Sequence, residues 1–234
     1  MNLKKIFLIK SILFLGIAIY LAFTFDKALS NLVFKSGISW FYGSIVLRLM
    51  ICLAFARGLQ LVFKAFESKI KGILTFLIGL TLGFGISFIA RPIYDLDYGH
   101  YENSNLKLDL EALNKQTNYS LSTNNKPALI AFFHTDCNGC KEMSKDIGKY
   151  QKLGHIPQVI ALFGGTEEDA LTFMTNQNGQ NFTYHMISDE DYFKKTADYA
   201  FPAVYYVNSN GETITFWHSS GLSYHALDII KENK

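Results

Sequence analysis

Apolar positions divide the chain into two parts with different patterns. Residues 1–90 are dominated by Leu, Ile, Phe, Ala and Gly, whereas residues 91–234 mix polar and apolar positions as a soluble domain does. The first part holds three apolar runs long enough to cross a bilayer as helices, at about 6–25, 40–63 and 72–90. The pattern predicts an all-α transmembrane region, a linker and a soluble domain, at 1–92, 93–103 and 104–234.

The first apolar run has two interpretations. Lys4 and Lys5 precede it, and Lys10 is its only charged position. One interpretation is a cleaved signal peptide, but the run is longer than the usual signal-peptide core of about 7–15 residues. We therefore expect a retained membrane anchor.

Basic residues indicate how the spans are oriented. They flank the first span and fill the short connection between the second and third, at Lys4, Lys5, Lys10, Lys64, Lys69 and Lys71. Because connections rich in Lys and Arg stay in the cytoplasm, the chain after Arg91 should lie outside it, even if the first run is cleaved. The prediction is a three-pass protein in the lipid bilayer of a bacterial cytoplasmic (inner) membrane, with an extracytoplasmic, periplasmic C-terminal domain.

Charged and small residues inside the spans carry further predictions. The side chain of Arg48 either extends toward the headgroup layer or faces a partner helix or polar cavity, and its place near the aromatic end of the second span favours the first. Arg57 lies closer to the other end and is a candidate for a role in function or assembly. Gly79, Gly83 and Gly85 lie on or near one face of the third span, and the first two have the spacing of a close helix contact.

The soluble half alternates short apolar runs with helical segments. The predicted strands are 128–133, 158–163, 182–187, 203–207 and 213–217. The predicted helices are 141–152, 166–174, 189–199 and 223–231. Leucines from 106 to 113 start either a short helix or a strand, and 208–211 has the residues of a hairpin turn. This order predicts an α/β fold with a mixed sheet flanked by helices.

Composition excludes several function classes. The net charge is only +2, and no Lys/Arg cluster alternates with aromatics, so we expect no nucleic-acid partner. Three cysteines are too few for a disulfide-stapled scaffold. One of them, Cys52, stands alone in the second span and is expected to be small apolar filling. Because a thiol relay needs a pair, the chain alone is not expected to carry electrons across the membrane.

The other two cysteines follow the predicted strand that Pro127 opens. Cys137 and Cys140 fall on the first turn of the next predicted helix, whose N–H donors and partial positive charge favour thiolate over thiol. One alternative is a structural zinc site, but this needs four ligands, and only His134 is close in sequence. Another alternative is a static disulfide. We expect a redox-active pair, with no metal and no other cofactor.

Two motifs together carry a family resemblance. They are the strand followed by Cys137-Asn-Gly-Cys140-Lys-Glu-Met143, and Phe201-Pro202 followed by a strand and Asn-Gly. Together they resemble the thioredoxin fold over 104–234. The long stretch between the two motifs is similar to that of the membrane-anchored thiol-disulfide oxidoreductases of cytochrome maturation and periplasmic reduction.

This resemblance implies a role for each motif residue. Cys137 would be the exposed nucleophile, and Cys140 would resolve the mixed disulfide. Pro202 would be a cis-proline that places the backbone of Phe201 beside the sulfurs, where an extended substrate segment binds. An ordinary edge-strand proline is the alternative. The implied partners are protein disulfide substrates and a membrane electron donor or larger membrane complex.

Several positions depart from the family pattern. Asp136 replaces the Trp that commonly precedes the first cysteine, and Ala131 replaces a buried acid that assists the second. Asp136 disfavours a thiolate at the first cysteine, whereas Lys141 favours it. Glu142 is either a substitute for the missing acid or a solvated helix residue, and His134 is either a tuning group or a strand-end histidine. Because no histidine separates the cysteines, the pattern favours a reductase.

A second resemblance keeps another function open. Residues 45–60 resemble the first helix of the DoxX/MauE-like membrane proteins, which implies a membrane module that works alongside redox enzymes. Arg48, Arg57 and the missing Trp and acid favour a non-catalytic subunit of a membrane complex that uses its thioredoxin-like domain for docking or assembly. The intact cysteine pair with Pro202 favours an extracytoplasmic, membrane-anchored thiol-disulfide oxidoreductase.

Overall fold

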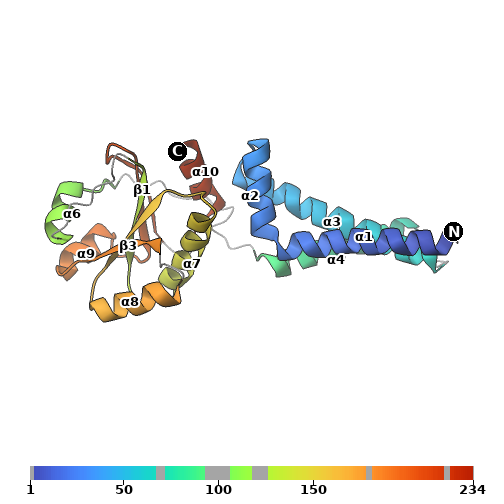
Figure 1. Cartoon of the computed structure of the whole chain (residues 1–234), viewed down its shortest axis with the longest axis horizontal. Helices are drawn as coiled ribbons and strands as arrows, with labels where there is room; N and C mark the ends of the chain where they lie inside the picture. The colour runs from blue at the N-terminus through green and yellow to red at the C-terminus, as the bar shows by residue number, and fades with distance from the viewer. Residues whose placement is uncertain are drawn as a thin grey trace. The chain divides into compact units, whose positions relative to one another are not determined.

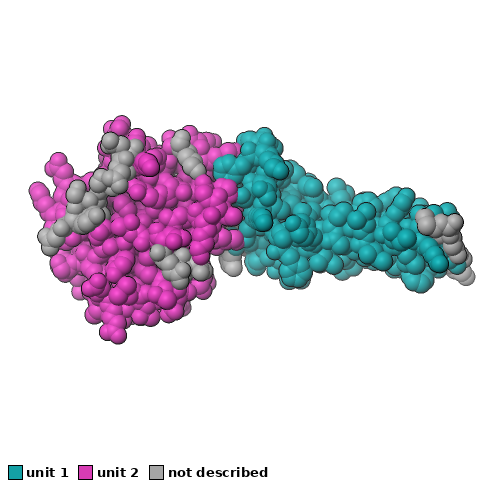
Figure 2. Space-filling view, in the orientation of Figure 1, with its two compact units in different colours: residues 1–95 teal, residues 96–234 magenta. Residues whose placement is uncertain are grey.

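The chain divides into two compact units, residues 1–95 (unit 1) and 96–234 (unit 2), coloured separately in Figure 2. The computed structural model describes residues 3–66, 72–92, 106–117, 126–177, 181–218 and 222–233. Each unit buries its own set of apolar side chains. The predicted linker, 93–103, lies outside the described residues.

Unit 1 contains three long apolar helices, α1 (Leu3–Phe23), α3 (Trp40–Ala65) and α4 (Gly72–Ala90). Each is long and apolar enough to cross a membrane, which confirms the predicted runs. α3 packs along both α1 and α4, as Figure 1 shows. Large apolar side chains stay exposed on the outer faces, for example Ile12 on α1 and Ile73 on α4, as expected of a surface that faces lipid.

A further helix, α2 (Phe25–Ser36), begins one residue after α1 ends and stands at a steep angle to it (Figure 1). The sequence predicts no element here, because the segment is too short and too polar for a span. Its buried residues include Leu29 and Val33, which recur on one helical face, and the helix packs on α3. Gly37 ends the helix in the left-handed conformation, and its N–H donates to the carbonyl of Val33.

Glycines allow α3 and α4 to approach closely. A Cβ atom on Gly79 would lie 2.6 Å from the Cα of Ala56, and one on Gly83 would lie 2.9 Å from the Cα of Cys52. These distances confirm the predicted helix contact, because a larger residue would push the two backbones apart. Gly85 faces open space and takes no part in this contact. Cys52 is buried against α4, as small apolar filling would be.

Arg48 faces a partner helix, α4, which is the alternative to extension toward the headgroup layer. The residue is only 5% exposed. Its Nη1 donates to the carbonyl of Ser87 and its Nη2 to that of Arg91, both at 2.9 Å. The rings of Phe25 and Phe88 lie 5.0 Å and 4.7 Å from its guanidinium carbon. The cation binds the last carbonyls of α4, where the negative end of the helix dipole favours it.

The remaining two arginines of unit 1 are arranged differently. Arg57 is exposed on α3 and donates to the Oε1 of Gln60 on the same helix. Gln60 donates in turn to the carbonyl of Gly72 at the start of α4. The Nε of Arg91 lies 3.6 Å from the carboxylate of Asp26, in the first turn of α2. Polar contacts thus join α3 to both ends of α4, and α4 to α2.

The described part of unit 2 contains one mixed five-stranded sheet in the order β3-β2-β1-β4-β5. Its strands are β1 (Ala128–Phe133), β2 (Gln158–Phe163), β3 (Thr183–Met186), β4 (Ala203–Val207) and β5 (Thr213–His218). β1 is parallel to β2 and β2 to β3, whereas β4 is antiparallel to both β1 and β5. The predicted bounds of β1, β2 and β4 are confirmed, whereas β3 is one residue shorter than predicted at each end and β5 is one residue longer at its end.

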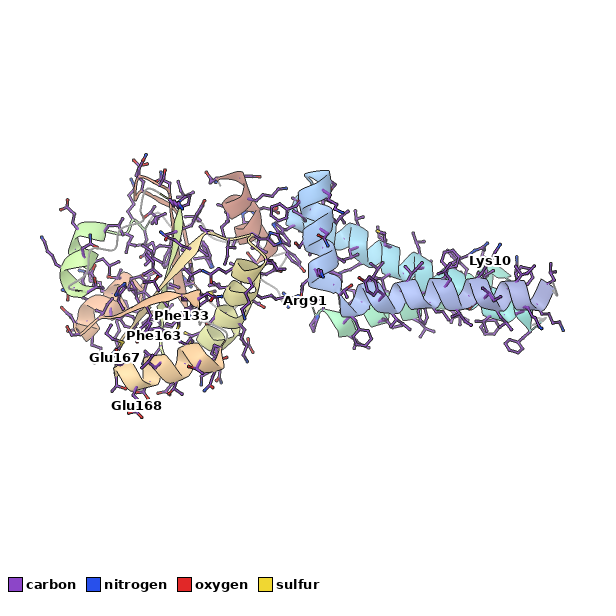
Figure 3. All side chains as sticks on the ribbon, in the orientation of Figure 1. Lys10, Arg91, Phe133, Phe163, Glu167 and Glu168 are labelled. Atoms are coloured by element: carbon purple, nitrogen blue, oxygen red, sulfur yellow. The ribbon has the colours of Figure 1, made fainter. Side chains whose placement is uncertain are left out.

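Helices cover both faces of this sheet. They are α6 (Leu110–Thr117), α7 (Asn138–Lys152), α8 (Glu167–Asn176), α9 (Glu190–Thr196) and α10 (Tyr224–Glu232). Because side chains alternate along a strand, Phe132 of β1 packs on Phe193 of α9, and Phe133 packs on Phe173 of α8. Phe133 also contacts Phe163 of β2, and both rings are labelled in Figure 3. This arrangement is the thioredoxin fold, as predicted.

Candidate functional site

Cys137 stands at the start of α7 in the N-cap position. Its backbone is extended, and its Sγ accepts a hydrogen bond from the N–H of Cys140 at 3.1 Å. The oxygen-bearing side chains of Thr166, Asp189 and Ser223 hold the same position at α8, α9 and α10. The sulfur therefore lies where a helix offers unpaired N–H donors and the positive end of its dipole, which favour negative charge.

Cys140 lies one turn into α7 and differs sharply from Cys137 in its surroundings. It is fully buried, whereas Cys137 is partly exposed, and both thiols are free. Burial raises the pKa of the Cys140 thiol far above its ordinary value, and its contact with Cys137 raises that pKa further. The pair is therefore asymmetric: Cys137 is accessible from outside, and Cys140 keeps its proton at neutral pH.

The loop between α9 and β4 brings a second backbone segment to these sulfurs. The Phe201–Pro202 peptide bond is cis, as the resemblance implies. The thiol of Cys137 donates to the carbonyl of Phe201, with 3.6 Å between sulfur and oxygen. The ring of Phe201 stacks on Phe193 with centroids 5.0 Å apart, and it lies 5.9 Å from the ring of His134. Residues from two distant parts of the sequence thus meet at Cys137.

The four candidate tuning residues all lie around the start of α7, with different exposure. His134, Asp136 and Glu142 are exposed, and Lys141 is half-buried. The N–H of Asp136 donates to the Nδ1 of His134 at 3.4 Å. The exposure of Glu142 matches its interpretation as a solvated helix residue, because Cys140, the thiol it would assist, is fully buried.

No buried carboxylate replaces the missing acid within the part of the chain that the structure describes. Ala131 is fully buried on β1, and no Asp or Glu among the described residues is buried. The same residues contain no group of three or more His, Cys, Asp or Glu side chains that could hold a metal ion.

Two residues that the sequence does not single out lie beside the Phe201–Pro202 loop. Asp198 and Tyr199 adopt left-handed backbone conformations, with φ of 52° and 56°. Sequence patterns associate that conformation with Gly, Asn and Asp, so Tyr199 is not flagged by its type. Their position just before Phe201 is the one signal that could have drawn attention to them.

Tyr205 of β4 connects the two elements that flank this loop. Its hydroxyl donates to the carbonyl of Thr196, at the end of α9, at 2.6 Å. Its ring contacts Phe132 and Phe216 in the core. Burial raises the pKa of Tyr205 to about 12. The residue joins β4 to α9, the two elements between which the loop runs.

Tyr205 should make the stability of unit 2 sensitive to alkaline pH. Because its pKa is about 12 in the folded chain and about 10 when unfolded, its contribution is complete below the unfolded pKa and is lost as pH rises through the folded one. We expect Tyr205→Phe to flatten this decline and to cost about 1 kcal/mol at neutral pH through the lost hydrogen bond. Urea unfolding followed by Trp217 fluorescence, in a Trp40→Phe background, measures both effects.

Tyr199→Phe is the matched control for this prediction, because its hydroxyl belongs to an exposed side chain. It should leave the alkaline decline unchanged. An equally steep decline in the Tyr205→Phe chain would contradict the assignment to Tyr205.

No family model and no curated protein matches the chain. Several solved structures are similar to part of it. One similar structure is a secreted Mycobacterium tuberculosis disulfide oxidoreductase homologous to E. coli DsbE, at 17% identity, covering 44% of this chain and 78% of that one, with a TM-score of 0.37. StoA from Bacillus subtilis has 13% identity, covering 44% and 81%, with a TM-score of 0.38. The thioredoxin domain of a Bacteroides vulgatus thiol-disulfide oxidoreductase has 14% identity, covering 47% and 77%, with a TM-score of 0.36. The thioredoxin fold of unit 2 is identified by its own sheet order and strand directions.

Proposed function

We propose that the protein is a membrane-anchored thiol-disulfide oxidoreductase that reduces disulfides of exported proteins. The observation that carries this proposal is the arrangement at the start of α7. A partly exposed sulfur of Cys137 accepts a helix N–H, lies 3.6 Å from the carbonyl of Phe201, and has the buried thiol of Cys140 one turn away. Such an arrangement supports one nucleophilic thiol and one resolving thiol.

The reaction balances as a two-electron exchange. The thiolate of Cys137 attacks one sulfur of a substrate disulfide, and the substrate S–S bond breaks as a mixed disulfide forms. The released substrate thiolate is a base, and it or solvent takes the proton of Cys140. The new thiolate of Cys140 attacks the Sγ of Cys137 and releases the second substrate thiolate. The substrate gains two electrons, and the enzyme keeps a Cys137–Cys140 disulfide.

The direction of this exchange is proposed as reductive. Asp136 and the lack of a histidine between the cysteines disfavour a strongly oxidising pair. Reduction of the enzyme disulfide then requires a dithiol donor, which we assign to a separate membrane redox partner. The resemblance of residues 45–60 to the DoxX/MauE-like proteins supports such a partner, and Cys52, a single buried thiol, cannot replace it.

The site is proposed to lie on the periplasmic side of a bacterial inner membrane. The three helices long enough to cross a membrane support an anchor, and the lysines at the N-terminus and between α3 and α4 support this orientation. The alternative function, a non-catalytic docking subunit, has less support than the sequence alone gives it. Arg48, one of its supports, binds carbonyls of its own unit, whereas Arg57 stays exposed.

A redox titration of the full chain tests the proposed function. The chain in detergent is equilibrated with glutathione buffers of increasing oxidising power, and free thiols are then trapped with a maleimide and counted by mass. We expect Cys137 and Cys140 to lose their labels together in one two-electron transition. Cys52 is the internal control and should behave identically in all the buffers. Failure of the pair to join in any buffer would argue against the proposal.

A further inference from the structure

The turn that leads from α9 into the active-site loop has an unusual backbone. Asp198 and Tyr199 both have positive φ, at 52° and 56°. The N–H of Asp198 donates to the carbonyl of Lys195, and the N–H of Tyr199 to that of Lys194, so the end of the helix holds both in place. The left-handed conformation is strained for a residue with a Cβ atom, and glycine would adopt it without strain.

The side chain of Tyr199 makes no hydrogen bond or ring contact with a described residue that would offset this strain. It is 73% exposed, more than any other large hydrophobic side chain in the described part of unit 2. Its ring makes no ring contact, and its hydroxyl no hydrogen bond, with any described residue. By contrast, the hydroxyls of Tyr205 and Tyr206 both donate to backbone carbonyls. Among the described residues, Tyr199 thus has no hydrogen bond or ring contact by which its side chain would stabilise the fold, and the side chain is exposed.

The segment that carries this ring also carries the backbone carbonyl that reaches the reactive thiol. Tyr199 is two residues from Phe201, so their Cα atoms are at most about 7 Å apart. The carbonyl of Phe201 lies 3.6 Å from the Sγ of Cys137. The stacking of Phe201 on Phe193 holds the loop against α9. The exposed tyrosine thus belongs to the segment that a polypeptide would meet when its cysteine reacts with Cys137.

We propose that Tyr199 selects the substrate: it packs against an apolar or aromatic side chain beside the reacting cysteine of an extended polypeptide. This inference rests on the proposed function and narrows its substrate class to protein disulfides with apolar flanks. Residues two apart in an extended segment lie about 7 Å from one another, so a side chain beside the reacting cysteine can lie as far from it as Tyr199 can lie from Phe201. An exposed tyrosine ring suits this role, since aromatic pairs gain energy beyond the area they bury.

Three disulfides distinguish the possible outcomes for the full chain in detergent. They are a peptide disulfide flanked by Phe, the same peptide flanked by Gly, and bis(2-hydroxyethyl) disulfide, with dithiothreitol as electron donor. We expect Tyr199→Gly to lower the preference for the Phe-flanked over the Gly-flanked peptide by about tenfold. The same variant should melt at a higher temperature, because glycine removes the strain at φ of 56°.

Two further variants complete the test. Tyr199→Phe should keep the preference, because the ring remains. Leu171→Ala removes another exposed apolar side chain, on α8, and should leave all three rates unchanged. An unchanged preference in Tyr199→Gly, or an equal loss toward all three disulfides, would overturn the role of Tyr199 while leaving the proposed function intact. An unmodified chain that reduces none of the three would refute the proposed function, and this inference with it.

Discussion

The Cys140→Ala variant should accumulate a substrate protein joined to Cys137 by a disulfide bond. The reason is the asymmetry of the pair: Cys137 is accessible and forms the mixed disulfide, whereas the buried Cys140 supplies the thiol that resolves it. Without Cys140 the mixed disulfide has no internal route to release. Membranes from cells that make the variant, alkylated and run on a non-reducing gel, should show adducts that disappear with dithiothreitol.

The Cys137→Ala variant is the opposite case and should show no adducts at all. The remaining thiol is fully buried and has a raised pKa, so it is a poor nucleophile toward any external disulfide. We expect disulfide reduction by this variant to fall by about 10³-fold or more. Cys52→Ala is the matched control, because it removes a thiol that lies in a different unit, and it should behave as the unmodified chain does. Adducts that persist in Cys137→Ala/Cys140→Ala but vanish in Cys52→Ala/Cys140→Ala would contradict the assignment.

Replacing Arg48 by Met should destabilise unit 1 substantially. The change removes two hydrogen bonds to carbonyls at the end of α4 and two contacts with ring faces. Because the carbonyls of Ser87 and Arg91 then lose a charged donor, we expect a cost of about 2 kcal/mol or more. Arg48→Lys should be intermediate, since an ammonium cannot reproduce the fork that contacts both carbonyls.

Arg57→Met is the matched control for this prediction. It removes the same side chain from the same helix, but at an exposed position with one hydrogen bond to Gln60. Cys52, buried on α3, provides the readout: in a Cys137→Ser/Cys140→Ser background, a maleimide dye reaches it only when unit 1 opens. Faster labelling on heating is expected for Arg48→Met alone. Equal labelling rates for the two Met variants would show that the buried contacts of Arg48 add nothing to stability.

Much of unit 2 can be predicted from its sequence because its elements are defined by local patterns. The strands β1, β2 and β4 are continuous apolar runs, and their predicted bounds agree with the structure. The spacing of Cys137 and Cys140 determines that both fall on the first turn of one helix, since a helix rises one turn in about 3.6 residues. The identity of Phe201-Pro202 as the facing segment comes from the family resemblance, because nothing local in that pattern refers to Cys137.

Interactions between distant residues are what the sequence does not reveal. Arg48 is near one end of an apolar helix, and only the position of α4 decides whether it faces lipid or the carbonyl of Ser87, 39 positions away. α2 has too few apolar residues to be recognised as a membrane element, and it is defined by packing on α3. Tyr199 has a residue type that does not predict positive φ, and the hydrogen bonds at the end of α9 impose it.

The sequence by itself thus determined the elements, the three apolar helices and the two thiols on one helical turn, because each depends on residues near one another in the chain. The tertiary structure alone decided that the carbonyl of Phe201 lies 3.6 Å from the Sγ of Cys137, and that Cys140 is fully buried. It also decided that Tyr199, two residues before Phe201, is exposed. Those features depend on the packing of β4, α7 and α9 around β1, and packing distances are properties of the folded core.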